Sequence, residues 1–331
     1  MRAAVMKQFG QVPVVEEFDE PHVAPEEAAA LIQVRYGALN PLDLKIASGT
    51  FYGTRPDLPY VVGNEGMGVV RSSETLRAGT RVYFGAARPG AVAELAVARD
   101  DSLVEVPDAL EDAVASGLGV AGVAAWESLR LAGLQAGERV LVLGATGAVG
   151  SIAVQVAKIM GAARVVAAGR DRAGLARLCA HRDVSGDMTN AAGADACVAL
   201  EDDDPSVIAR RIVEAARGEV DVIVDPLWGK PALAALIAAA PGARLVNLGD
   251  SAGEHIELPS ALVRSRSLRV LGYTNFRLTP SEQRSALENL FLNAVQGRLF
   301  LDHEVLAIQD IAKAWERQAD SPHVKLVVEI S

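Results

Sequence analysis

Cysteine is scarce in this sequence: its 331 residues include only two, Cys179 and Cys197. Two thiols cannot supply the four ligands of a structural zinc site. Disulfides are rare in a reducing cytosol, so the sequence predicts two buried free thiols. The five histidines match neither the spacing of a metal site nor that of a nucleophile triad.

Positive charge is in deficit, with 32 Lys and Arg residues against 42 Asp and Glu and a net charge of −10. No run of Lys or Arg forms the basic stripe that tracks phosphates, so nucleic acid is not an expected partner. The most apolar stretches, such as residues 114–126, contain glycine and are too short for a bilayer. The opening residues lack the apolar stretch of a signal peptide. We therefore expect a cytoplasmic protein without a membrane partner.

What the sequence does have is the composition of a folded protein, with 50% hydrophobic and 22% charged residues. Its length allows about two domains. Up to about residue 98, short β-type runs are broken by Gly and Pro, as in a small barrel or sandwich. From about residue 114, strands alternate with Ala- and Leu-rich helices. This alternation predicts an α/β fold with a doubly wound parallel sheet.

The segment VLVLGATGAVGSIAVQVAKIMGA, residues 140–162, predicts a strand over 139–143, a turn over 144–150 and a helix over about 150–160. A dinucleotide fold needs glycine where the chain turns, where the backbone approaches a pyrophosphate, and where helix packs on strand. The helix N-terminus then attracts the diphosphate. Such turns also occur for packing alone, but the flanking elements favour dinucleotide binding. The expected contacts are Ala145, Thr146, Gly147, Ala148, Val149 and Gly150.

The second strand of such a unit ends about 20 residues later, where an acidic residue would bind a ribose 2′-hydroxyl. The sequence has Gly169 there, followed by Arg170 and Arg172. An arginine can pair with a 2′-phosphate, so these three residues favour NADPH over NADH. The alternative is a solvated Arg170, with Asp171 as a helix cap or a displaced ribose ligand.

Three motifs follow one another along the chain: Asn40-Pro41-x-Asp43, Gly63-x-Glu65-x-x-Gly68 and Ala145-x-Gly147-x-x-Gly150. In order and spacing they resemble the medium-chain dehydrogenase/reductases, and within them the zinc-free quinone oxidoreductase group. The resemblance covers nearly the whole chain. It implies a GroES-like substrate domain (residues 1–118 and 274–331) and a Rossmann NADP-binding domain (residues 119–273). It also implies a homodimer that pairs Rossmann edge strands, here residues 267–273.

Zinc-dependent relatives carry a Cys at the position of Asn40 and a His at that of Asn64, so the resemblance implies that no metal is bound. Reduction of an isolated ketone needs a Lewis acid to stabilise the developing alkoxide. Conjugated acceptors, such as quinones, enones and 2-enoyl thioesters, delocalise the charge instead. Hydrogen-bond donors then suffice.

The resemblance places Asn40 and Asp43 near the nicotinamide. Asn40 would donate to a substrate carbonyl, unless it only shapes the turn before Pro41. Asp43 would act as an acid or organise the loop. Phe51 would stack on a flat substrate, and Tyr52 is the candidate proton donor, shifted by one place. Further expected cofactor contacts are Asn247, Gly249, Ser251, Tyr273, Asn275 and Lys325.

The leading interpretation is an NADPH-dependent, zinc-independent oxidoreductase that transfers hydride to a quinone or an α,β-unsaturated carbonyl acceptor. A 2-enoyl thioester reductase is the alternative among enzymes. Many relatives have a threonine that contacts the nicotinamide where this chain has Ala124. That difference leaves open a third hypothesis, an NADPH-binding sensor or crystallin-like structural protein without turnover.

Overall fold

The computed structural model describes residues 1–24, 26–53, 55–180, 193–201 and 204–330. Within these ranges the chain divides into two compact units. Unit 1 comprises Met1–Ala121, Leu278–Val295 and Leu301–Ser331, and unit 2 comprises Gly122–Arg277 and Gln296–Phe300. Helix α3 (Gly119–Ala132) begins in unit 1 and continues into unit 2.

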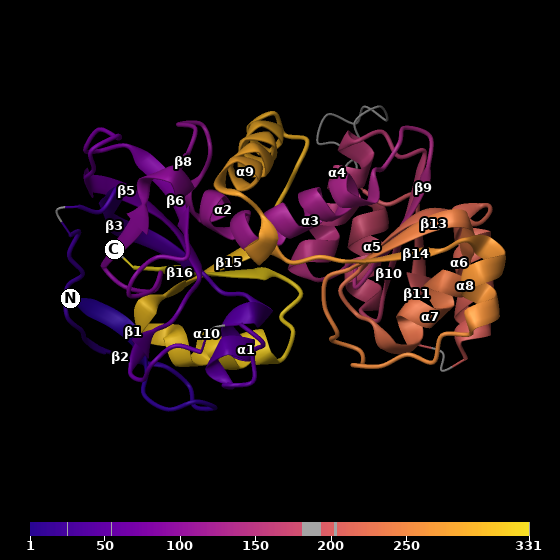
Figure 1. Cartoon of the computed structure of the whole chain (residues 1–331), viewed down its shortest axis with the longest axis horizontal. Helices are drawn as coiled ribbons and strands as arrows, with labels where there is room; N and C mark the ends of the chain where they lie inside the picture. The colour runs from indigo at the N-terminus through magenta and orange to yellow at the C-terminus, as the bar shows by residue number, and fades with distance from the viewer. Residues whose placement is uncertain (25, 54, 181–192, 202–203, 331) are drawn as a thin grey trace. The chain divides into compact units, whose positions relative to one another are not determined.

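Unit 2 contains a six-stranded parallel sheet, of which Figure 1 labels five strands. The strand order is β11-β10-β9-β12-β13-β14. From β9 the chain adds β10 and β11 on one side of the sheet. It then returns and adds β12, β13 and β14 on the opposite side. The order therefore reverses between β9 and β12, which is the switch point of a Rossmann fold. The strands are β9 (Arg139–Leu143), β10 (Arg164–Gly169), β11 (Ala196–Ala199), β12 (Val220–Asp225), β13 (Ala239–Asn247) and β14 (Arg269–Gly272).

Both faces of this sheet are buried. Leu141 and Leu143 of β9 share a core cluster with Ile208 of α6. Val140 and Val142 alternate with them and are also fully buried. Because successive strand residues point to opposite faces, apolar groups cover the sheet on both sides, and the predicted doubly wound fold is confirmed. The helices of unit 2 are α4 (Ala148–Ile159), α5 (Arg172–Ala180), α6 (Pro205–Ala216), α7 (Gly229–Ile237) and α8 (Ser260–Arg266).

Unit 1 is mainly antiparallel. A seven-stranded sheet follows the order β15-β16-β3-β5-β6-β8, with β7 also paired to β3, and a three-stranded sheet follows the order β2-β1-β4. The last strand, β16, pairs with β3, so the end of the chain completes the sheet begun near its start. The strands are β1 (Arg2–Met6), β2 (Val14–Glu17), β3 (Ala29–Ala38), β4 (Tyr60–Val61), β5 (Glu65–Ser72), β6 (Arg81–Gly85), β7 (Leu95–Arg99), β8 (Val104–Glu105), β15 (His303–Ala307) and β16 (Lys325–Glu329). The helices are α1 (Pro41–Ala47), α2 (Asp112–Gly117), α9 (Pro280–Val295) and α10 (Ile311–Ala319).

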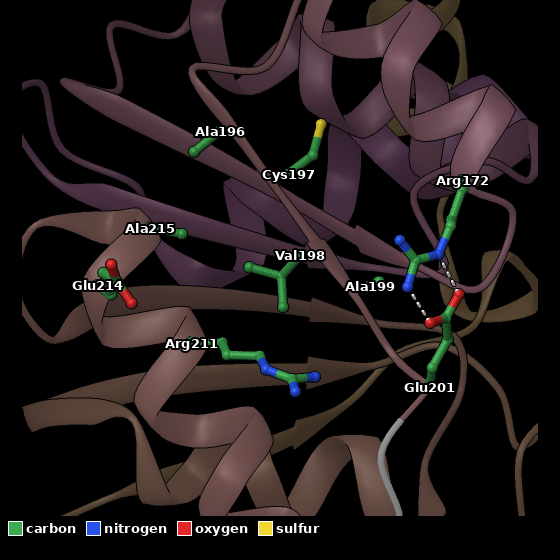
Figure 2. A pocket seen from close by; sticks show the side chains of 9 residues that line it. All are labelled: Arg172, Ala196, Cys197, Val198, Ala199, Glu201, Arg211, Glu214 and Ala215. Atoms are coloured by element: carbon green, nitrogen blue, oxygen red, sulfur yellow. Dashed lines mark hydrogen bonds and ion pairs between the residues drawn. The ribbon is translucent and has the colours of Figure 1, made fainter.

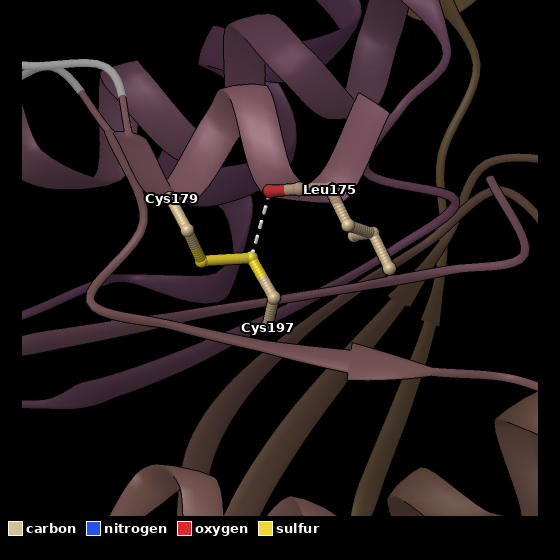
Figure 3. Close-up of a disulfide and its surroundings, with 3 residues drawn as sticks. All are labelled: Leu175, Cys179 and Cys197. Carbon is tan, nitrogen blue, oxygen red and sulfur yellow. Dashed lines mark hydrogen bonds between the residues drawn. A yellow bond between two sulfur atoms is a disulfide. The ribbon is translucent and has the colours of Figure 1, made fainter. Parts of the chain in front are cut away.

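The two cysteines form a disulfide, and the prediction of buried free thiols is wrong (Figure 3). Cys179 lies near the end of α5 and Cys197 in β11, with 6.5 Å between their Cα atoms. That separation is within the range that a disulfide spans. The Cys197 sulfur also lies 3.1 Å from Leu175 O, a contact without a hydrogen because a disulfide sulfur carries none. The expectation failed because it rested on the redox compartment, whereas the packing of α5 beside β11 decides whether the sulfurs meet.

Candidate functional site

The glycine turn begins where β9 ends. Gly144 has a φ of +58°, a left-handed conformation that glycine adopts without steric cost. Ala145 N–H donates to Ala168 O of β10 at 3.0 Å and fixes the turn against the neighbouring strand. Helix α4 then begins at Ala148 with Gly147 as its N-cap. The first N–H groups of a helix precede its intrahelical bonds, and they stabilise an anion there.

The two later glycines of the turn differ in their surroundings. A Cβ atom on Gly150 would lie 2.3 Å from Gly144 O and 2.6 Å from Ala145 Cα, so chain packing itself requires glycine. A Cβ atom on Gly147 would meet only Gly144 O, at 3.4 Å, and the φ of −81° at Gly147 suits any residue. Packing within the described chain therefore does not require glycine at position 147. Its bare backbone fits the close approach of a dinucleotide diphosphate.

The end of β10 lies beside this turn. A Cβ atom on Gly169 would be 3.5 Å from Thr146 Oγ1, so these two predicted contacts are neighbours. Arg170 follows on the surface, and no carboxylate in the described ranges forms an ion pair with it. Asp171 accepts Ala173 N–H at 3.0 Å at the start of α5. Its carboxylate therefore caps that helix, while the Arg170 guanidinium is available to a ligand.

The other predicted arginine, Arg172, is engaged on the surface. It forms a two-pronged ion pair with Glu201, whose hydrogen bond raises the pKa of the guanidinium (Figure 2). Both side chains line a hollow of about 760 Å³ between α5, β11 and α6. All its charged side chains are exposed, and we assign it no ligand. Its lining is Arg172, Ala196, Cys197, Val198, Ala199, Glu201, Arg211, Glu214 and Ala215.

Hydrogen bonds hold the loops that follow β12 and β13. Asp225, which the sequence analysis did not single out, is fully buried and accepts two backbone N–H groups of the next turn at 2.9 Å each. Burial raises the pKa of Asp225. Asn247 Nδ2 donates to Gly249 O at 2.7 Å, and Ser251 Oγ donates to Pro226 O at 3.1 Å. These three predicted cofactor contacts thus shape the loops at the end of the sheet.

The predicted residues after β14 join the same edge. Tyr273 N–H donates to Asn247 O at 3.0 Å, and the Tyr273 hydroxyl donates to Asn275 Oδ1 at 2.7 Å. Because all six strands are parallel, the segments that follow them lie along one edge of the sheet. Ligands of open α/β sheets bind at this carboxyl edge, beside the switch point.

In unit 1, Asn40 and Asp43 organise the start of α1. Asp43 Oδ2 accepts the Asn40 backbone N–H at 2.7 Å, which is one half of a capping box. Asp43 Oδ1 accepts Asn64 Nδ2, also at 2.7 Å. Burial raises the pKa of Asp43 to about 6, although both hydrogen bonds act to lower it. Asp43 therefore fixes the loop and also titrates just below neutral pH.

Glu65 is the fully buried centre of the polar cluster in unit 1. Its Oε1 accepts Asn40 Nδ2 at 2.7 Å and Lys325 Nζ at 2.8 Å. Its Oε2 accepts the Tyr83 hydroxyl at 3.1 Å and the Val120 N–H. Lys325 Nζ also donates to Asn40 Oδ1 at 2.6 Å. Lys325, expected as a cofactor contact, is 2% exposed, and its ammonium is held inside unit 1.

Phe51 and Tyr52, the predicted stacking residue and proton donor, follow α1 and contact each other. The ring centroids of Phe51 and Tyr52 are 4.5 Å apart, and Tyr52 is 80% exposed. The buried carboxylates Glu65 and Asp225 received no role from the sequence. Both share a usable signal, because each stands at one end of a strand, directly beside a run of buried or nearly buried apolar and glycine residues. A carboxylate in such a place is rarely buried without partners.

Two absences hold for the described part of the chain. No three His, Cys, Asp or Glu side chains in it are grouped so that they could hold a metal ion. None of its helices combines the length and the apolar character needed to cross a membrane.

Comparison with known proteins matches both units. Residues 26–108 match the family described as alcohol dehydrogenase GroES-like domain, and residues 148–291 match the family described as zinc-binding dehydrogenase. The quinone oxidoreductase of Thermus thermophilus, solved also in complex with NADPH, has a TM-score of 0.82 and 26% identity, with 100% of both chains covered.

Two curated relatives extend the comparison. The chain is 31% identical to a phenolphthiocerol/phthiocerol polyketide synthase protein of Mycobacterium tuberculosis, over 99% of this chain and 15% of that protein. It is 34% identical to the quinone oxidoreductase of Pongo abelii, over 49% of this chain and 50% of that protein. The matches thus span about half of the oxidoreductase and a small part of the synthase.

A GroES-like unit together with a Rossmann-fold unit that carries a glycine turn defines a class of nucleotide-dependent dehydrogenases. The chain belongs to the medium-chain dehydrogenase/reductase superfamily, in its quinone oxidoreductase-like group. The family resemblance of the three sequence motifs is confirmed.

Proposed function

We propose that this protein is an NADPH-dependent oxidoreductase that transfers hydride to a quinone or an α,β-unsaturated carbonyl acceptor without a metal ion. The observation that carries the proposal is the juxtaposition of Gly147 and Arg170. They follow β9 and β10, which are paired in parallel. One offers bare backbone for a diphosphate, and the other offers a guanidinium for a 2′-phosphate.

The residues of unit 2 would bind and orient the cofactor. The N-terminus of α4 would stabilise the diphosphate, and Arg170 would pair with the phosphate that NADPH has and NADH lacks. A charge-assisted hydrogen bond contributes about 1.5–3 kcal/mol, enough to set the preference between the two. When bound, the reduced nicotinamide supplies the hydride. The NADPH complex of the Thermus thermophilus protein supports this choice of cofactor.

The amides of unit 1 support metal-free chemistry. Asn40 and Asn64 stand where the zinc-dependent relatives have Cys and His, and zinc sites are built from thiolate, imidazole and carboxylate ligands. In this chain both amides are hydrogen-bonded to the buried carboxylates Glu65 and Asp43. A conjugated acceptor suits such a site, because the electron pair that hydride displaces moves onto the acceptor oxygen. One proton from water then completes the two-electron reduction.

A second candidate is the reduction of a 2-enoyl thioester. The observation that favours it is the alignment of 99% of this chain with a segment of the polyketide synthase. The acceptor in that case is again conjugated, so hydride addition again moves an electron pair onto the carbonyl oxygen and one proton from water completes the reduction.

The test is a panel of acceptors with the full chain. NADPH oxidation is followed with 1,2-naphthoquinone, 9,10-phenanthrenequinone, an alkenal, a crotonyl thioester and a simple ketone. Turnover of a quinone or the alkenal supports the proposal, and turnover of the thioester alone supports the second candidate. Tight NADPH binding without any turnover would favour a sensor or structural protein. Ketone reduction that requires added zinc would overturn the metal-free chemistry.

We also propose that the protein forms a homodimer through β14. This strand ends the six-stranded sheet, and within the described ranges it pairs only with β13. An edge strand with open backbone groups can pair with its copy in a second chain. Val270, 41% exposed on this strand, supports an interface. A dimer by light scattering that a Val270→Pro substitution dissociates is the expected result, and a wild-type monomer contradicts it.

A further inference from the structure

The segments that follow β12 and β13 contact the glycine turn at the carboxyl edge of the sheet in unit 2. A Cβ atom on Gly144 would lie 3.1 Å from both Leu227 Cδ2 and Pro226 Cγ, so the segment after β12 packs directly against the turn. The Ala252 N–H donates to Leu227 O at 2.8 Å and joins the segment after β13 to it. The three segments therefore contact one another in order, on both sides of the switch point between β9 and β12.

Asp225 is the buried group that connects the segments after β12 and β13. It is the last residue of β12 and is 0% exposed. Its Oδ1 accepts the N–H groups of Leu227 and Trp228 at 2.9 Å each, and its Oδ2 accepts Asn247 Nδ2, at the end of β13, at 3.3 Å. A carboxylate presents acceptors at both oxygens, whereas an amide has one acceptor end and one donor end. Asp225 therefore binds two segments at once, which an asparagine in its place could not do.

The shape of this segment is energetically costly. Trp228 has a φ of +55°, a conformation that residues with a side chain rarely adopt. Burial raises the pKa of Asp225 although its three hydrogen bonds act to lower it, so the fold disfavours the charged carboxylate. Strained backbone and buried groups with shifted pKa values are concentrated at ligand sites. Both features indicate that this segment is shaped for a site rather than for stability.

The position of Arg170 decides which half of the cofactor would lie here. In the proposed function Arg170, which follows β10, pairs with the 2′-phosphate, and that phosphate belongs to the adenosine ribose. Beyond the switch point, β12, β13 and β14 form the second mononucleotide-binding half of a Rossmann sheet. The nicotinamide half of the cofactor would therefore lie along the segments that follow β12 and β13.

We propose that Asp225 is a positioning residue for the nicotinamide half of the cofactor. The proposal rests on the proposed function and deepens it, because it gives a role to a carboxylate outside the three sequence motifs. Asp225 does not touch the cofactor, since its side chain is covered by protein. It acts through the segments after β12 and β13, whose backbone it fixes before the cofactor binds. A site that is ordered in advance binds its ligand more tightly, because less ordering remains to be done on binding.

The experiment compares the full chain with Asp225→Asn and with Asp221→Asn as a matched control. The asparagine at position 225 can still accept the N–H groups of the next turn, but its amide nitrogen then faces the amide nitrogen of Asn247. The link between the two segments is lost while no charge is buried, so we expect a Tm close to that of wild type. Asp221 stands near the amino end of the same strand, where its Oδ2 accepts the Arg139 N–H at 2.8 Å.

Two ligands distinguish the halves of the cofactor. NADPH contains both halves, whereas 2′,5′-ADP contains only the adenosine half with its 2′-phosphate, and equilibrium titration gives a Kd for each. We expect Asp225→Asn to raise the Kd for NADPH by about tenfold or more, as loss of one hydrogen bond to a charged group allows, and to leave the Kd for 2′,5′-ADP within about twofold of wild type. Asp221→Asn should change neither Kd.

The fluorescence anisotropy of the reduced nicotinamide in bound NADPH gives a second readout. It measures how far the nicotinamide ring is immobilised, which a purely structural role of Asp225 would not change. At saturating NADPH we expect a lower anisotropy with Asp225→Asn than with wild type, and the wild-type value with Asp221→Asn.

The other outcomes contradict the assignment. In Asp225→Asn, unchanged NADPH affinity and anisotropy, or equal losses of affinity for NADPH and 2′,5′-ADP, would overturn the role of Asp225 and leave the proposed function intact. A large fall in the Tm of Asp225→Asn would show that the carboxylate serves folding, and it overturns the role as well. A wild-type protein that binds neither ligand overturns the proposed function and the role of Asp225 together.

Discussion

The two glycines of the turn after β9 provide a matched pair of substitutions. Gly147→Ala adds a methyl group that meets no atom closer than 3.4 Å, at a φ of −81°. We therefore expect the free energy of unfolding to stay within about 1 kcal/mol of wild type. If the diphosphate lies against this backbone, the methyl group displaces it and breaks at least one charge-assisted hydrogen bond. The loss is about 1.5–3 kcal/mol, or about 10- to 150-fold in the Kd for NADPH.

Gly150→Ala, by contrast, should lower the free energy of unfolding. Its methyl group would lie 2.3 Å from Gly144 O and 2.6 Å from Ala145 Cα, and backbone atoms cannot rotate aside as side chains do. Overpacking of this kind costs about 1–3 kcal/mol of folding free energy. Urea denaturation measures the stability of both variants, and fluorescence titration measures their affinity for NADPH. A Gly147→Ala variant that binds NADPH as tightly as wild type would refute the placement of the diphosphate.

Three further predictions test other parts of the molecule. Arg170→Ala should weaken NADPH binding by about 1.5–3 kcal/mol and leave NADH binding nearly unchanged; equal losses in titrations with both cofactors would contradict the 2′-phosphate contact. Lys325→Met leaves the buried carboxylate of Glu65 without its cation and should cost about 3–5 kcal/mol in urea denaturation, only part of it recovered when Glu65→Gln is added, because the glutamine amide nitrogen cannot accept the Val120 N–H; a loss below about 1 kcal/mol would argue against this buried ion pair. The raised pKa of Asp43 means that the folded state holds this proton more tightly than the unfolded state, so stability falls as pH rises from about 4 to 6, by about 3 kcal/mol at most. Asp43→Asn should flatten that decline, and parallel pH–stability curves for the two proteins would refute the assignment.

The glycine turn and its flanking strand and helix were predictable, because they are formed by residues that are close together in the sequence. The strand predicted over residues 139–143 is β9, and the helix predicted to begin near residue 150 is α4, which starts at Ala148. Apolar alternation and glycine spacing act over a few residues, and neighbours alone settle them. The parallel order of the sheet followed, because strands alternating with helices have few other ways to bury both faces.

The long-range features did not follow from the sequence. Lys325 meets Glu65 across 260 residues of chain, and that buried pair depends on the pairing of β16 with β3. No local pattern distinguishes a lysine that will be buried from one that stays in water. The disulfide was predicted wrongly for the same reason, since the sulfurs meet only when α5 packs beside β11.

By itself the sequence determined the glycine turn after β9, the doubly wound sheet and the family, because each depends on residue type and on spacing within short segments. Only the tertiary structure decided which polar side chains are buried and what they face. It raised the pKa of Asp43 to about 6 and buried the Tyr60 hydroxyl, to which no described residue offers an acceptor. Burial and electrostatic environment are set by atoms from distant parts of the chain, so the properties of these two groups exist only in the folded protein.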